Sequence, residues 1–128
     1  MAQHPLEPLS AEEFRQTAEI LRRDGRVVDS YRFTSIELKE PPKAEVKAWR
    51  PGDAIPRTSF AVLLDRTENK TYEATVDLTG NAVVSVEHIP GVMPNFTVDE
   101  FHDVDHAMRE HPEVIAALAQ RGFTDMDL

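Results

Sequence analysis

Residues 60–89 read FAVLLDRTENKTYEATVDLTGNAVVSVEHI and contain three extended segments joined by two short polar turns. The first segment, Phe60 to Leu64, is continuously apolar, as is typical of a strand that lies centrally in a sheet. In the second, apolar residues alternate from Tyr72 to Leu78. Consecutive strands joined by short turns pair as hairpins, so this stretch predicts an antiparallel sheet.

Two further strands are predicted upstream of this ladder. In a regular strand, Tyr31 and Phe33 would lie on one face of the sheet. Ile36 and Leu38 follow at even-numbered positions and would lie on the other face. A bulge near residues 34–35 would restore the phase. Residues 44–48 also alternate between apolar and polar side chains, and we interpret them as a strand that precedes a turn.

A helix is predicted before the sheet. Ser10 and Glu13 have the spacing of a capping box, in which each side chain accepts a hydrogen bond from the other residue's amide. Gly25 supplies the left-handed residue that ends such a helix. The expected apolar stripe comprises Phe14, Ala18 and Leu21. One helix packed on a curved antiparallel sheet of four to five strands is an α+β fold.

Two more helices are predicted near the C-terminus. Thr97 and Glu100 repeat the capping-box spacing, and Pro112 suits the first turn of the shorter helix that follows. Two helices without strands cannot form a domain alone. We therefore expect their apolar faces to rest on the preceding domain, on another subunit or on polypeptide outside this sequence.

Composition excludes several classes of function. The 128 residues have a formal net charge of -9, which repels phosphate backbones and anionic lipids, so we expect neither a nucleic acid nor a membrane partner. The chain has no cysteine, which removes disulfides and thiolate chemistry. Because no secretory signal and no apolar run of roughly 20 residues is present, a cytoplasmic location is the default expectation.

The sharpest local chemical pattern is a pair of histidines on the first C-terminal helix. His102 and His106 are four residues apart and Glu110 comes one turn later, a spacing that can hold zinc or copper. A dedicated site also needs supporting hydrogen bonds and shelter from water. We favour a solvated acidic helix face, so these three residues remain candidates and no metal ligand is assigned.

Five segments, in the family's own order, resemble the N-terminal region of copper amine oxidases. They are His4–Ser10 (HPLEPLS), Ile36–Pro41 (IELKEP), Tyr72–Leu78 (YEATVDL), Thr97–Glu100 (TVDE) and His111–Ile115 (HPEVI). The resemblance implies a small cystatin-like α+β domain over residues 1–96. It also implies that residues 97–128 are the opening helices of an incomplete second small domain.

The resemblance also implies where the chemistry of such an enzyme lies. In that family, copper and topaquinone oxidise primary amines to aldehyde, ammonia and hydrogen peroxide within a large C-terminal β-sandwich. The quinone tyrosine, the aspartate base and the copper histidines have no matching positions here, so we assign no catalytic or cofactor-binding residue. The implied partner is the catalytic β-sandwich of the same polypeptide, in a parent enzyme that is a homodimer.

The sequence leaves three functions open, the third of which is a metal-buffering helix around His102 and His106. The first is a non-catalytic structural and substrate-access module of a primary-amine oxidase. The alternative is a free-standing cystatin-like module that binds a small ligand or a peptide. A deep pocket lined by Tyr31, Phe33 and Tyr72 would favour the alternative, whereas a sheet face filled by the first helix would favour the module.

Overall fold

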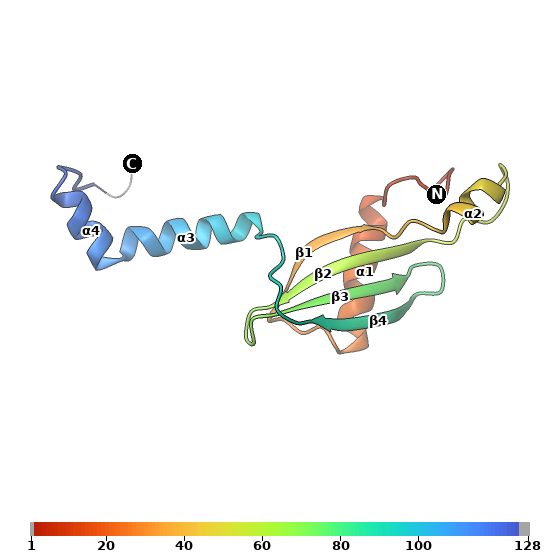
Figure 1. Cartoon of the computed structure of the whole chain (residues 1–128), viewed down its shortest axis with the longest axis horizontal. Coiled ribbons are helices and arrows are strands. Elements are labelled where there is room, and N and C mark those ends of the chain that lie inside the picture. The colour runs from red at the N-terminus through yellow and green to blue at the C-terminus, as the bar shows by residue number, and fades with distance from the viewer. Residues whose placement is uncertain (1, 126–128) are drawn as a thin grey trace. The chain divides into compact units, whose positions relative to one another are not determined.

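The computed structural model describes residues 2–125, and the chain divides into two compact units, Met1–Pro94 and Asn95–Leu128. We call them the N-terminal unit and the C-terminal unit. The N-terminal unit contains α1 (Ala11–Asp24), β1 (Tyr31–Leu38), α2 (Lys43–Ala48), β2 (Thr58–Asp65), β3 (Lys70–Asp77) and β4 (Ala82–Ile89) (Figure 1). The C-terminal unit contains α3 (Val98–Glu110) and α4 (Pro112–Ala119).

The four strands form one antiparallel sheet in the order β1-β2-β3-β4, and α1 packs on one of its faces (Figure 1). This arrangement confirms the predicted α+β fold. The register of β1 against β2 shifts between Phe33 and Ser35, where the bulge was expected. Because of this shift, apolar residues on both sides of the bulge pack toward α1.

The first helix begins and ends as its sequence predicts. Ser10 N donates to Glu13 Oε2 at 2.8 Å, the reciprocal bond of the capping box is present, and Gly25 has a φ of 84° at the C-cap. Ile20 and Leu21 are buried against fully buried small residues of the sheet, Ala61 and Ala74. Small side chains at the centre of the sheet let the helix approach closely, which closes the core.

Two details of the sequence interpretation are wrong. Residues 43–48 form α2 rather than a strand, because five alternating residues are too few to distinguish the two periods and Ala, Glu and Lys favour helix. The sheet therefore has four strands. Phe14, expected on the apolar stripe, is 40% exposed, whereas Ile20 is buried, so the buried stripe is rotated around the helix.

The C-terminal unit has the two predicted helices. Thr97 N donates to Glu100 Oε2 at 2.6 Å at the start of α3, and Pro112 occupies the first turn of α4. Gly122 has a φ of 87° after α4. Between residues 2 and 125, no helix has both the length and the apolar character that crossing a membrane requires.

Candidate functional site

An aromatic cluster occupies the helix-covered face of the sheet. The Tyr31 and Tyr72 ring centroids are 5.4 Å apart, and those of Tyr72 and His88 are also 5.4 Å apart. The Arg22 guanidinium of α1 lies 5.3 Å from the centroid of the Phe33 ring. Burial, with the neighbouring Tyr72 hydroxyl, raises the pKa of Tyr31 to about 12, so its phenol stays protonated at neutral pH.

These aromatic rings are partly buried and lie at the border of the core. Tyr31, Phe33 and Tyr72 all pack against the buried cluster beneath α1. Four prominent hollows in the described part of the chain are lined by other side chains. α1 covers the sheet face on which these rings lie, which is the arrangement expected of the structural module.

A buried arginine holds the N-terminal segment to the sheet. Arg57 is 7% exposed, and its guanidinium donates to Glu13 Oε1 at 2.7 Å and to the carbonyls of Glu7 and Pro8 at 2.8 and 3.1 Å. The hydrogen bond from Arg57 lowers the pKa of Glu13 to about 2. The chain segment before α1 is thus fixed by an ionised pair at the edge of the core.

The arginine was not identified from the sequence. Its partners lie 44 to 50 residues away along the chain. No local pattern around Arg57 indicates a contact at that distance. The sequence does indicate one of the partners of Arg57. The capping box places the Glu13 carboxylate in the first turn of α1, where it can accept from a basic side chain as well as from Ser10 N.

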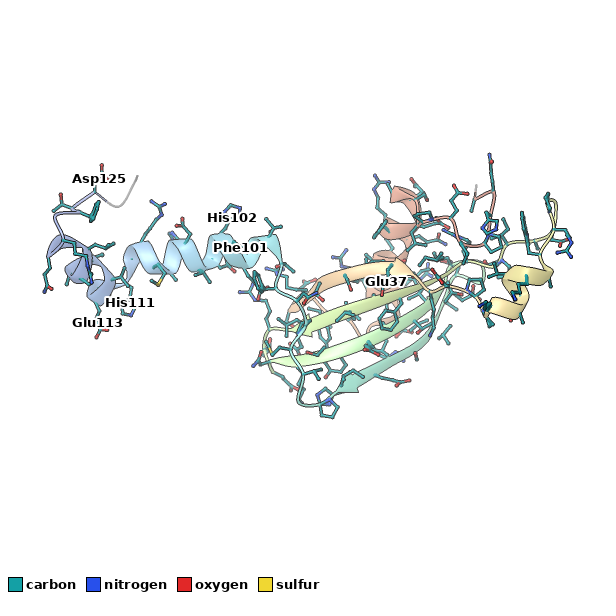
Figure 2. The ribbon with its side chains drawn as sticks, turned by 45° about the horizontal axis from the view of Figure 1, so that its top comes forward. Glu37, Phe101, His102, His111, Glu113 and Asp125 are labelled. Atoms are coloured by element: carbon teal, nitrogen blue, oxygen red, sulfur yellow. The ribbon has the colours of Figure 1, made fainter. Side chains whose placement is uncertain are left out.

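The candidate metal ligands lie on the exposed surface of α3. His106 Nε2 is 3.5 Å from Glu110 Oε1, and these two side chains are 75% and 70% exposed. His102 projects from the same helix (Figure 2). Within residues 2–125, no three His, Asp or Glu side chains gather as a metal-binding group. The interpretation of this face as a solvated surface stays a prediction.

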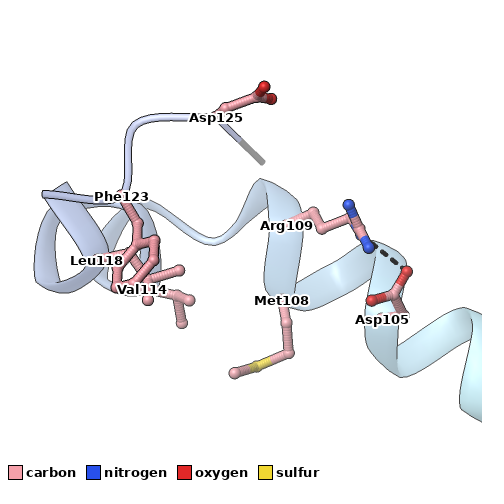
Figure 3. A pocket seen from close by; sticks show the side chains of 7 residues that line it. All are labelled: Asp105, Met108, Arg109, Val114, Leu118, Phe123 and Asp125. Carbon is pink, nitrogen blue, oxygen red and sulfur yellow. Dashed lines mark hydrogen bonds and ion pairs between the residues drawn. The ribbon is translucent and has the colours of Figure 1, made fainter. Parts of the chain in front are cut away.

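The C-terminal unit presents a large apolar surface. A hollow of about 540 Å³ lies between α3 and α4, with Met108 on one side and Val114, Leu118 and Phe123 on the other (Figure 3). Asp105 and Arg109 form an ion pair of 2.8 Å at its rim. The apolar face of α3 adds exposed side chains, namely Val98, Phe101 and Val104. Such a surface is suited to packing against protein.

Comparison with known proteins identifies the family. The model of the family described as the AGAO-like N2 domain matches residues 10–86. The chain belongs to this family. As an AGAO-like N2 domain, it is an N-terminal domain of copper amine oxidases, and the resemblance found in its five sequence segments is confirmed.

Curated relatives of this AGAO-like N2 domain are much longer proteins. "Primary amine oxidase" of Arthrobacter sp. (strain P1) is 43% identical over 126 residues, covering 98% of this chain and 19% of that protein. "Histamine oxidase" of Arthrobacter globiformis is 35% identical over 129 residues, covering 96% of this chain and 18% of that protein. The chain thus spans about a fifth of the length of these relatives.

A solved structure supports the fold. The copper-containing benzylamine oxidase from Hansenula polymorpha superposes with a TM-score of 0.79 at 20% sequence identity, over 91% of this chain and 19% of that one. At this identity the match establishes the fold alone. The N2 domain described here therefore has the α+β architecture found in part of a copper amine oxidase.

Proposed function

We propose that this chain is a non-catalytic structural module of a copper- and topaquinone-dependent primary-amine oxidase, which helps to shape the approach of the substrate. The parent reaction is the oxidative deamination of primary amines to aldehyde, ammonia and hydrogen peroxide. The proposal is supported by membership of the AGAO-like N2 family over residues 10–86. It is also supported by the packing of α1 on the sheet, which closes a continuous core in the N-terminal unit.

Catalysis is proposed to belong to other parts of the parent polypeptide. The copper site of the family uses three histidines, whereas His102 and His106 here lie on an exposed helix with Glu110 as a neighbouring carboxylate. Within residues 2–125 no third imidazole joins them. These residues therefore do not fit the copper site of the family.

The C-terminal unit is proposed to open a second small domain. Its α3 presents Phe101 at 61% exposure and Val98 at 72% exposure, with Met108 further along the helix. Exposed side chains of this size are normally covered by protein. We propose that later strands of the parent polypeptide cover them, and that the catalytic β-sandwich of a homodimeric enzyme is the partner of both units.

Two experiments test the proposal. In the first, the purified chain is incubated with copper and primary amines while peroxide and quinone absorption are measured; we expect neither. In the second, this chain replaces the matching segment of the 43%-identical Arthrobacter enzyme. We expect the chimera to form its quinone and to oxidise amines, whereas deletion of that segment lowers soluble active enzyme. Turnover by the chain alone, or full activity after the deletion, would refute the proposal.

A further inference from the structure

Strand β1 is an outer strand of the sheet, and part of its backbone is directed away from β2. Lys39 N donates to Thr58 O at 2.9 Å, which makes that position a hydrogen-bonded pair of the antiparallel ladder. In such a ladder, the residues that point toward the partner strand alternate with residues that point away. The N–H and C=O groups of Ile36 and Leu38 therefore face outward from the sheet.

A groove runs beside this strand. It has a volume of about 280 Å³, and Leu6 and Phe14, each 40% exposed, belong to its wall. Ile36 and Leu38 supply the β1 side of the groove, since both pack toward α1. The groove therefore joins an apolar wall to outward-facing backbone groups, which is the combination that an added strand uses.

The charge next to this segment is negative. Glu37 lies between Ile36 and Leu38, so the pleat places its side chain on the opposite face, away from α1. Lys39 shares that face, but its Nζ donates to Thr75 Oγ1 at 2.9 Å and is directed across the sheet toward β3. Glu40 follows at the end of the groove. A strand added here would thus meet the Glu37 carboxylate on the face where its polar residues stand, and the Glu40 carboxylate at the end of the groove.

We propose that the groove and the outer side of residues 35–40 bind an extended segment of a partner polypeptide, with apolar residues at alternate positions and Lys or Arg between them. The apolar side chains would enter the groove beside Phe14. The basic side chains would stand beside Glu37, because opposite charges on neighbouring strands stabilise the pairing. This interaction surface goes beyond the proposed role in an amine oxidase and does not depend on it.

A second copy of the chain is a poorer occupant. The net charge of -9 opposes self-association. The other outer strand, β4, has Glu87 directly opposite Glu73 of β3, so it too is acidic. Pairing β1 with either outer strand of another copy would bring carboxylates together. The bulge before Ser35 and the prolines after Glu40 also limit the pairing to a short segment, as expected of a reversible interaction.

Peptide binding to the full 128-residue chain tests this surface. The probes are two acetylated, fluorescent peptides of alternating residues, one of valine and lysine and one of valine and glutamate, followed by anisotropy. We expect the lysine peptide to bind and the glutamate peptide not to bind. Glu37→Lys should weaken binding of the lysine peptide about fivefold. The matched control Glu87→Lys, which makes the same charge change on β4, should leave it unchanged.

Two further measurements locate the site. Backbone amide shifts in NMR should change at Ile36 and Leu38, and Phe14→Ala should weaken binding where Val84→Ala, an exposed β4 change, does not. Equal binding of both peptides, no binding, or shifts confined to β4 would overturn the proposal. So would a dimer, seen by sedimentation, that blocks the peptide. None of these results bears on the amine oxidase chimera, so the two proposals fail separately.

Discussion

Arg57, the residue before β2, and Glu13 in the first turn of α1 form a two-pronged ion pair. Arg57 Nε lies 2.7 Å from Glu13 Oε1, and Nη2 lies 3.2 Å from Oε2. The same carboxylate accepts from Ser10 N, so one side chain both caps the helix and joins it to the sheet. A pair of this kind is costly to break on one side only, because the remaining charge stays buried.

Glu13→Gln should lower the free energy of unfolding at pH 7 by about 2 kcal/mol, since glutamine keeps the cap but loses the charge that Arg57 needs. The pKa of Glu13 is about 2 in the folded chain and 4.5 without its partners. The stabilisation is therefore present above pH 4.5 and is lost as the pH falls toward 2. Urea unfolding of both proteins across that range measures the effect.

The control for this series is Glu12→Gln. Glu12 is the neighbouring carboxylate in α1 and its side chain is 88% exposed, so its removal should change little. A difference between Glu13→Gln and the unmodified chain that persists unchanged at pH 2 would contradict the assigned role of the ion pair.

The buried hydroxyls of Thr17 and Ser59 join α1 to β2 by a hydrogen bond of 2.8 Å. Ser59→Ala should cost about 1 kcal/mol of unfolding free energy because the Thr17 hydroxyl loses a partner in the core. Thr17→Val should lower the unfolding free energy by less in the Ser59→Ala protein than in the unmodified chain. Denaturant titrations of the two single variants and the double variant measure this coupling, and strictly additive costs would show that the two hydroxyls act independently.

The N-terminal unit should fold without the C-terminal unit. A chain ending at Pro94 keeps the hydrogen bond from Thr71 Oγ1 to Val92 O, which is 2.8 Å long. We expect its melting temperature to match that of the first transition of the whole chain. A chain ending at Gly91 lacks that acceptor and should be about 1 kcal/mol less stable. Loss of cooperative unfolding in the Pro94 variant would mean that the two units depend on each other.

Zinc should not stabilise the chain. The His106 and Glu110 side chains are mostly exposed, and a site of this kind lacks the shelter and supporting contacts of a dedicated metal centre. Melting curves with and without zinc provide the measurement, with His106→Ala as the control. A rise in melting temperature with the unmodified chain that disappears in His106→Ala would establish a metal site on α3.

Much of the fold could be predicted from local patterns. Ser10, Glu13 and Gly25 delimit α1 because caps act within one turn of the helix. The hairpins of residues 58–89 are visible because strand periodicity and turn residues are local signals. The failure at residues 43–48 has the same origin, since five alternating residues satisfy a short helix as well as a strand.

The candidate surfaces could be predicted only in part. The spacing of His102 and His106 is visible in the sequence, but whether a third ligand approaches depends on chain folding. The contacts of Arg57 and the groove beside β1 were not predicted, because their residues come from distant segments. Phe14 is an example. Helical periodicity predicts that α1 has an apolar stripe, but it does not predict which residues of that stripe face the sheet.

The sequence by itself determined the secondary elements, the acidic character of the chain and its membership of the amine oxidase N-terminal family. These properties depend on residue types, short spacings and the order of motifs, all of which can be read from the sequence without knowing which distant residues are in contact. Tertiary structure alone decided how α1 is rotated against the sheet, that Arg57 clamps the N-terminal segment and that β1 leaves its outer backbone groups beside an apolar groove. The reason is physical: burial and pairing are set by which distant residues meet, and no local pattern specifies that.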